Sequence, residues 1–172
     1  MEVLIFLLVV LLGLRLAGAL GASRFTHWPT CGAYALAAML VLTGTTHFLP
    51  DSLAGGPAPT HADFVPMVPP FVPLPGFQVY LTGALELLGA VGLVLTRTRR
   101  PAGVGLAALF VALLPANIYT AVSDIAFNGA PAPSLWTRIP EQLLYIAIAL
   151  WAAGLLEPNR RRRVGATTDS AR

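Results

Sequence analysis

The residues of this chain that could do chemistry are polar side chains spaced four positions apart inside otherwise apolar segments. Gln78, Thr82 and Glu86 follow this spacing, which puts them on one face of a helix. Thr43 and His47 do the same in an earlier segment. A carboxyl group and an imidazole can exchange a proton with a bound molecule or hold it by hydrogen bonds. Because polar groups cost free energy in hydrocarbon, those that occur there are the strongest candidates for a site.

Two later segments carry polar stripes of the same kind, also concentrated toward one end. The stripes consist of Asn117, Thr120 and Asp124 in one segment and Arg138, Gln142 and Tyr145 in the next. From a helical rise of about 1.5 Å per residue, we predict an outward-open polar pocket with Glu86 at its floor and with His47 and Arg138 at its rim. The predicted ligand-binding residues are His47, Thr82, Glu86, Asn117, Arg138, Gln142 and Tyr145.

Glu86 is the strongest of these candidates for a functional residue. A carboxylate in an apolar segment must be protonated, paired or in contact with water. His47 and Arg138 are candidate partners, directly or through a neighbouring polar side chain. One interpretation is a site that handles a ligand or a proton. The other is a structural polar clasp between helices, a role that interhelical hydrogen bonds often have.

The composition places these segments in a membrane protein. Of 172 residues, 56% are hydrophobic and 11% are charged, and the mean hydropathy is +0.72. A soluble domain averages about 45–50% apolar and about 25% charged residues. The composition therefore excludes an ordinary soluble enzyme, a disordered tail and a nucleic-acid binder. We expect an all-α fold, a polytopic membrane helix bundle.

Five segments are long and apolar enough to be membrane spans, which need about 20 residues. They are residues 3–22, 31–49, 76–96, 102–122 and 139–156. The first has a second interpretation as a cleaved signal, because Ala17-Gly18-Ala19 resembles a signal-peptidase site. However, Glu2 stands where a basic residue is expected, and Arg15 interrupts the apolar stretch. We predict an uncleaved helix whose Arg15 extends to the nearer interface.

Arginine-bearing loops alternate with loops that lack basic residues, and this alternation predicts the orientation. Lysine is absent, and all 11 basic residues are arginine. Arg24, the turn 97–100 and the run 160–163 alternate with the loops 50–75 and 123–137, which carry acidic residues and no Lys or Arg. The positive-inside rule then puts the N-terminus outside and the C-terminus inside, with residues 157–172 as a basic cytoplasmic tail.

Residues 50–75 form the least usual loop. Eight of these 26 residues are proline, and the second half of the loop is also apolar. Proline cannot continue a helix, and unpaired backbone N–H groups cannot lie in lipid. We therefore predict a helix-free cap at the outer interface, whose side chains dip into the mouth of the bundle. A stiff interfacial linker is the alternative.

Cysteine and histidine usage indicates no redox pair and no metal site. Cys31 is the one cysteine, so the chain has no internal disulfide and no C-x-x-C pair. The three histidines lie 20 and 14 residues apart in different segments, a spacing that indicates neither a zinc triad nor a bis-histidine haem site. We assign no catalytic residue.

The polar motifs occur together in a known order. They are Gly44-Thr-Thr-His47-Phe48, Met67-Val-Pro-Pro70, Gly83-Ala-Leu-Glu86-Leu, Pro115-Ala-Asn117 and Arg138-Ile-Pro-Glu-Gln142. With them, residues 31–156 resemble the DoxX-like family of small bacterial integral membrane proteins. The resemblance implies a four-helix domain in the bacterial inner membrane, to which residues 1–30 add an N-terminal transmembrane helix and a basic linker. It also implies functional positions, which here are His47, Glu86, Asn117, Arg138 and Gln142.

The polar floor beneath an apolar cap favours a binding function. The DoxX-like family takes its name from members associated with thiosulfate:quinone oxidoreductase, and others are linked to thiol and oxidative-stress defence. We expect a redox-associated accessory that binds a quinone-like or other small amphipathic molecule, with electrons supplied by a partner subunit. A non-enzymatic assembly or stabilising factor for another membrane protein is the alternative. A small-molecule transporter is a weaker alternative, because we find no inverted repeat and no polar exit path.

The expected partners follow from these hypotheses. They are the lipid bilayer, a partner membrane or redox subunit, and a second copy of the chain in a homo-oligomer. Quinone is the one cofactor that the hypotheses suggest.

Overall fold

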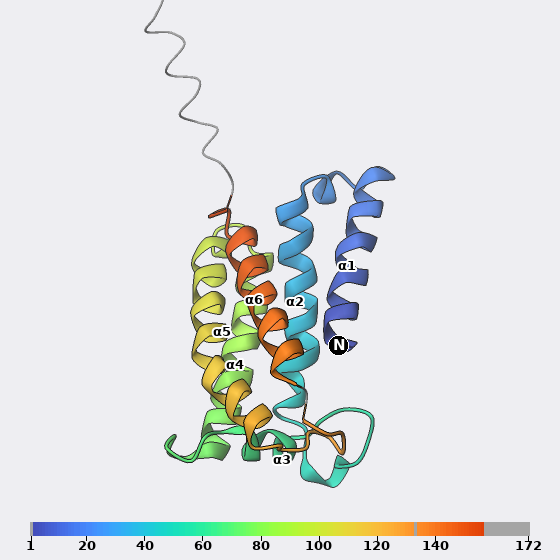
Figure 1. Cartoon of the computed structure of the whole chain (residues 1–172). Helices are drawn as coiled ribbons and strands as arrows, with labels where there is room; N and C mark the ends of the chain where they lie inside the picture. The colour runs from blue at the N-terminus through green and yellow to red at the C-terminus, as the bar shows by residue number, and fades with distance from the viewer. Residues whose placement is uncertain (1, 133, 157–172) are drawn as a thin grey trace, which may run out of the picture.

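The fold is all-α in the computed structural model, which describes residues 2–132 and 134–156 (Figure 1). Its elements are α1 (Glu2–Ala19), η1 (Ser23–Phe25), α2 (Trp28–Thr46), η2 (Asp51–Leu53), α3 (His61–Phe64), η3 (Val65–Met67), α4 (Pro75–Val94), α5 (Arg99–Val122) and α6 (Leu135–Ala152). In these ranges, an isolated bridge between Phe127 and Ala130 is the nearest approach to a strand. The predicted all-α fold is confirmed for these residues, and the predicted tail at 157–172 lies outside them.

The five long helices form a four-membered ring with one helix outside it (Figure 1). α4 packs against α2 and α5, and α6 packs against α5 and α2, which closes the ring. α1 packs on the outer side of α2. Each long helix runs opposite to the previous one, so the segments between helices gather at the two ends of the bundle (Figure 1).

Three of the described helices, α1, α4 and α5, are long and apolar enough to cross a membrane, by length and composition. The chain is therefore a membrane protein. α2 and α6 have 19 and 18 residues, so each is at least as long as α1, which has 18. Both carry more polar residues, among them Thr43, Thr45 and Thr46 in α2 and Arg138, Glu141 and Gln142 in α6. The predicted count of five spans is not established by this criterion.

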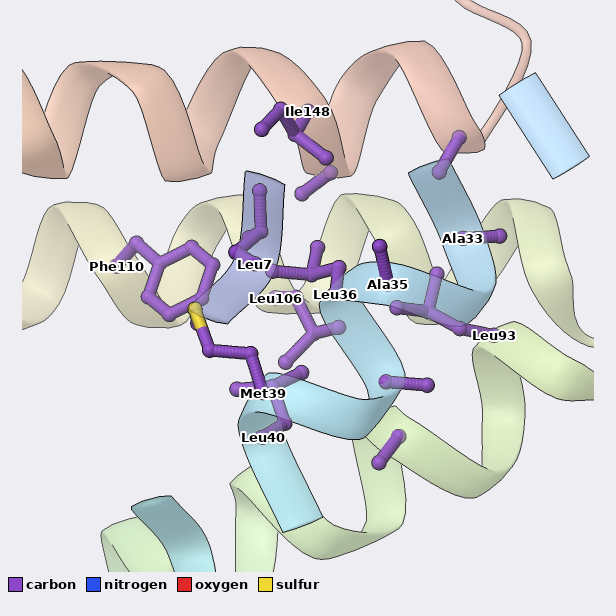
Figure 2. Close-up of a cluster of buried hydrophobic side chains, with 14 of the residues drawn as sticks. Leu7, Ala33, Ala35, Leu36, Met39, Leu40, Leu93, Leu106, Phe110 and Ile148 are labelled. Carbon is purple, nitrogen blue, oxygen red and sulfur yellow. The ribbon is translucent and has the colours of Figure 1, made fainter. Parts of the chain in front are cut away.

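The core is centred on α2, which buries residues around most of its circumference. Leu36 and Leu40 have no exposed surface. Figure 2 shows their side chains among buried residues of the four neighbouring helices, which are Leu7, Leu93, Leu106, Phe110 and Ile148. Most of the remaining buried α2 residues are alanine or glycine, and these small residues allow neighbouring helices to approach closely.

The ends of the five long helices differ from the sequence prediction by up to four residues. The last predicted span, 139–156, forms a helix four residues earlier, from Leu135 to Ala152. Pro140 is accommodated in the second turn of this helix, and Gly154 ends it with a positive φ of 73°. The helix predicted to begin at residue 102 begins at Arg99, with Pro101 in its first turn, where a missing backbone N–H costs nothing.

The proline-rich segment contains short helical turns, so the prediction of a helix-free cap was wrong. α3 begins with a capping box in which Thr60 and Asp63 satisfy each other's backbone N–H groups. Pro66 then occupies the first turn of η3. Four of the eight prolines follow this point, in residues 69–75, where no helix forms until Pro75 begins α4. Residues 47–74, here called the cap, close one end of the bundle (Figure 1).

The two ends of the bundle differ in charge. The end opposite the cap, here called the arginine end, carries Arg15, Arg24, Arg97, Arg99 and Arg100. The carboxylates of the described residues lie at the cap, in the nearby loop, within α4 and α6, or at the start of α1, and they are Glu2, Asp51, Asp63, Glu86, Asp124 and Glu141. This separation agrees with the loop alternation seen in the sequence.

Two glycines allow α2 and α4 to approach where the polar stripes face each other. A Cβ atom at Gly83 of α4 would lie 2.6 Å from the Cβ of His47. A Cβ at Gly44 of α2 would lie 3.2 Å from the Cβ of Glu86. The glycines therefore bring the imidazole and the carboxyl group together.

We expect Gly83→Ala to destabilise the protein by about 1–3 kcal/mol, because the added methyl group overpacks the contact with His47. Gly105→Ala is the matched control, since a Cβ there meets nothing within 4 Å. It should be neutral or should raise stability through helix propensity, by up to about 1 kcal/mol. Thermal unfolding of both variants in detergent measures the difference, and equal effects would contradict the proposed close approach.

Candidate functional site

The centre of the candidate site is a buried carboxyl group between α2 and α4. Glu86 is 7% exposed. The Thr43 hydroxyl donates a hydrogen bond to its Oε2 at 2.9 Å. Its Oε1 faces Nε2 of His47 at 4.0 Å. This cluster of Thr43, His47, Thr82 and Glu86 is called the polar cluster below.

The His47 ring is held in one orientation. Its Nδ1 lies 2.9 Å from the backbone carbonyl of Val79 and 3.3 Å from the hydroxyl oxygen of Thr82. Because a carbonyl oxygen can only accept, Nδ1 carries a proton and donates it there. The Thr82 hydroxyl donates to the same carbonyl at 2.9 Å. In the neutral ring, Nε2 is then an acceptor that points toward Glu86, and at 4.0 Å the two groups do not form a direct hydrogen bond.

The cap covers this histidine with an aromatic ring. Phe64, at the end of α3, stacks on His47 with ring centroids 4.2 Å apart and an interplanar angle of 17°. Phe127, from the loop before α6, packs edge-to-face with Phe64, and the two ring centroids are 5.0 Å apart. The polar cluster therefore has a roof built from two separate loops.

A second histidine fastens the cap to the bundle. His61 of α3 donates from Nε2 to the carbonyl of Gly76 at 3.1 Å and stacks on Tyr80 at 4.1 Å. Both partners belong to the first turns of α4. His61 therefore fixes the position of α3, and with it the position of the Phe64 ring.

The amides of Asn117 and Gln142 form a separate pair between α5 and α6. The Asn117 amide donates to Oε1 of Gln142 at 3.2 Å, and the Gln142 amide donates to the carbonyl of Phe110 at 2.7 Å. Pro115 stands inside α5 and leaves the backbone about one turn earlier without a full set of helical hydrogen bonds. The Gln142 amide supplies a hydrogen-bond donor to a backbone carbonyl in that turn, the carbonyl of Phe110.

Arg138 and Tyr145 of α6 form a third group. Arg138 interacts electrostatically with Glu141 and Tyr145, which lie on neighbouring turns of the same helix. Among the described residues, no hydrogen bond or ion pair joins Arg138 to Glu86, and Nε of Arg138 is buried without a hydrogen-bond partner. Tyr145 packs its ring at 6.0 Å from Phe110.

The structure thus divides the predicted site residues into three groups. His47, Thr82 and Glu86 meet in the polar cluster, while Asn117 and Gln142 pair between the other two helices. His47, one of the two predicted partners of Glu86, faces the carboxyl group at 4.0 Å, and the predicted depths of rim and floor stay a prediction. Arg138 remains apart, with Glu141 as its carboxylate neighbour.

Three contributors to the site were not among the predicted ligand-binding residues. Thr43 shares the helical spacing of His47, so its place on the stripe could have indicated its bond to Glu86. Phe64 is the first residue of the apolar run in the cap, but no pattern in the sequence indicates that this ring stacks on an imidazole. The carbonyl of Val79 has no sequence signal, since any residue supplies one.

The chemistry available at the polar cluster is proton transfer and hydrogen bonding. Within residues 2–132 and 134–156, no group of three His, Cys, Asp or Glu side chains could hold a metal ion. A hollow of about 260 Å³ lies elsewhere, between α4 and α5, and is lined by leucine, alanine and glycine. Its apolar lining offers no hydrogen bonds from side chains.

Comparison with known proteins gives a family. A family described as a domain of unknown function (DUF8561) matches residues 36–153, which include all of the predicted site residues. The chain belongs to this family. No curated protein matches the chain, and no solved structure matches it.

We expect a double-mutant cycle to detect the interaction between Asn117 and Gln142. Asn117→Ala and Gln142→Ala should each lower the free energy of unfolding, and Gln142→Ala should lower it more because Gln142 also bonds the Phe110 carbonyl. The coupling energy should be about 0.6 kcal/mol, the average for hydrogen bonds between membrane helices. Unfolding in detergent measures it. Asn117→Ala combined with Thr43→Ala, which shares no partner with it, should be additive.

Proposed function

We propose that the chain is a membrane accessory protein that binds a quinone-like or other small amphipathic molecule at the polar cluster beneath the cap. One observation carries this proposal. Oε1 of Glu86 and Nε2 of His47 face each other at 4.0 Å, which is longer than a hydrogen bond, in a site roofed by an aromatic ring. A polar atom of a ligand, or a water molecule, can bridge two such groups from the side, at hydrogen-bond distance from each.

A carbonyl-bearing, flat ligand suits these surroundings. A protonated carboxyl or imidazole donates to a carbonyl oxygen, and the Phe64 ring makes the surroundings of the cluster aromatic. If the bound molecule is reduced, its oxygen needs a proton, which Glu86 or His47 can supply. On this proposal a partner subunit would supply the electrons.

Arg138 is a second contact point on this proposal. Its Nε is buried at the cap side of α6 without a hydrogen-bond partner in the described part of the chain. Buried donors of this kind are normally paired. A ligand oxygen would satisfy it and would extend the site from the polar cluster toward α6.

The alternative function, a non-enzymatic assembly or stabilising factor, is favoured by a different observation. The Thr43–Glu86 bond joins α2 to α4, and the Asn117–Gln142 bond joins α5 to α6. Each is a complete interhelical contact that needs no ligand. On this hypothesis the polar residues hold the bundle together and its lipid-facing surface binds another membrane protein.

We also propose that all five long helices cross the membrane, with the N-terminus outside and the C-terminus inside, in the inner membrane of a bacterium. α2 and α6 are more polar than the other three, but Thr43 of α2 and Gln142 of α6 bond to neighbouring helices, at Glu86 and at the Phe110 carbonyl. The arginine end would then lie at the cytoplasmic side. The DoxX-like resemblance, which covers the four-helix ring, agrees with this arrangement.

We expect the wild-type protein, purified gently in native lipid, to carry a stoichiometric quinone or other small amphipathic molecule, and Glu86→Gln to lose it. The glutamine oxygen still accepts from Thr43, so the helix contact is kept while the acid is removed. Mass spectrometry and the UV-visible spectrum of an organic extract measure the molecule.

Asp124→Asn is the matched control for this experiment. It makes the same acid-to-amide change on an exposed residue, and its φ of 49° is one that asparagine adopts readily. The control should retain the molecule. Bulk phospholipid alone in the wild-type extract would contradict the binding proposal. In that case Glu86→Ala should still lower the melting temperature, as the alternative function requires.

The orientation is tested with fusions made in bacteria. A fluorescent protein fused after Arg172 should fluoresce, and alkaline phosphatase at the same place should be inactive, because the C-terminus is expected inside. Phosphatase fused after Asp124, at the cap side, should be active. The reverse pattern would contradict the proposed orientation. Phosphatase activity at both places would contradict the proposal that α6 crosses the membrane.

A further inference from the structure

Two guanidinium groups from separate elements converge on one tyrosine at the arginine end. Tyr34 lies in α2. The Arg24 Cζ of η1 is 5.0 Å from its ring centroid, and the Arg99 Cζ of α5 is 5.9 Å from it. Arg15 of α1 contacts a different ring of α2, with its Cζ 5.4 Å from the ring centroid of Trp28. Cation–π contacts at these distances are attractive, but they leave most guanidinium N–H donors available.

Two polar atoms in this region are buried and lack a partner. The hydroxyl of Tyr34 and Nε of Arg15 form no hydrogen bond in the described part of the chain. By contrast, Nε of Arg99 donates to the carbonyl of Leu93 at 2.8 Å, which holds that side chain in position. Because buried polar atoms are normally satisfied, the two unpaired atoms indicate a missing partner.

The positive charges at the arginine end indicate that the missing partner is an anion. The described carboxylates lie toward the cap or, for Glu2, at the far end of α1 from Arg15, so none is available at the arginine end. Gathering three positive groups without a counter-charge is unfavourable. An anion with several acceptor oxygens would pair with the guanidinium groups and accept from the tyrosine hydroxyl. A phosphate group has this geometry.

We propose that Arg24, Tyr34 and Arg99, with Arg15 at the same end of the bundle, bind the phosphate group of an anionic phospholipid. The lipid is favoured over free phosphate by the position of the site, at the ends of apolar helices where headgroups lie. Trp28, which contacts Arg15, is 44% exposed, and tryptophan is typical of the membrane interface. Basic pockets at the ends of transmembrane helices bind anionic headgroups in this way.

Native mass spectrometry of the full chain in detergent, titrated with phosphatidylglycerol or phosphatidylcholine, tests the proposal. We expect the wild type to retain phosphatidylglycerol in preference to phosphatidylcholine. Arg24→Gln and Arg99→Gln should each weaken that binding about fivefold, the effect of one basic residue near a membrane surface. Tyr34→Phe, which removes only the unpaired hydroxyl, should also weaken it while the protein stays folded.

Arg97→Gln is the matched control, because Arg97 is an exposed arginine of the same end whose loss changes the net charge equally. It should leave lipid binding unchanged. Equal retention of both lipids by the wild type would overturn the proposal, as would a loss on Arg97→Gln as large as that on Arg24→Gln. Displacement of the lipid by an equal concentration of inorganic phosphate would overturn the assignment to a lipid.

Discussion

The arrangement of this protein depends on the cost of burying a carboxyl group in an apolar bundle. Glu86 is tolerated because Thr43 donates to one of its oxygens and the His47 ring faces the other. Those contacts require α2 and α4 to approach more closely than side chains would normally permit, and Gly44 and Gly83 make this approach available. Gly44, Gly83 and the polar stripes are therefore parts of one constraint.

The same constraint explains why the cap is ordered around histidines. An imidazole buried beside a carboxyl group must have its ring nitrogens oriented, and the Val79 carbonyl fixes which nitrogen of His47 faces Glu86. Phe64 then covers the ring, and His61 holds the helix turn that carries Phe64. A chain of contacts thus runs from the buried acid to the surface of the cap. Its members come from segments that are distant in the sequence, so the order of the cap follows from the core and not from its own composition.

The sequence predicted the helices and the stripes but not how the stripes pair. Hydropathy indicated five long segments, because apolar composition over about 20 residues is a strong signal. Helical spacing put His47 and Glu86 on inward faces. It could not indicate that Gly83 brings their side chains within 4.0 Å or that Arg138 has Glu141 as a neighbour. Which residues face each other across helices depends on crossing geometry, and the short turns of the cap depend on local capping at Thr60.

A purely structural contact between α2 and α4 would need fewer side chains than the polar cluster contains. The Thr43–Glu86 bond alone joins the two helices, as the Asn117–Gln142 bond joins the other two without any histidine or aromatic cover. The polar cluster adds an oriented imidazole whose Nε2 stops short of hydrogen-bond distance from the acid, under a stacked ring from a separate loop. The Thr43–Glu86 bond does not itself require this orientation and cover. They are what a site needs in order to exchange a proton with a bound molecule while excluding bulk solvent, and this surplus is our reason for preferring the binding hypothesis to the structural one.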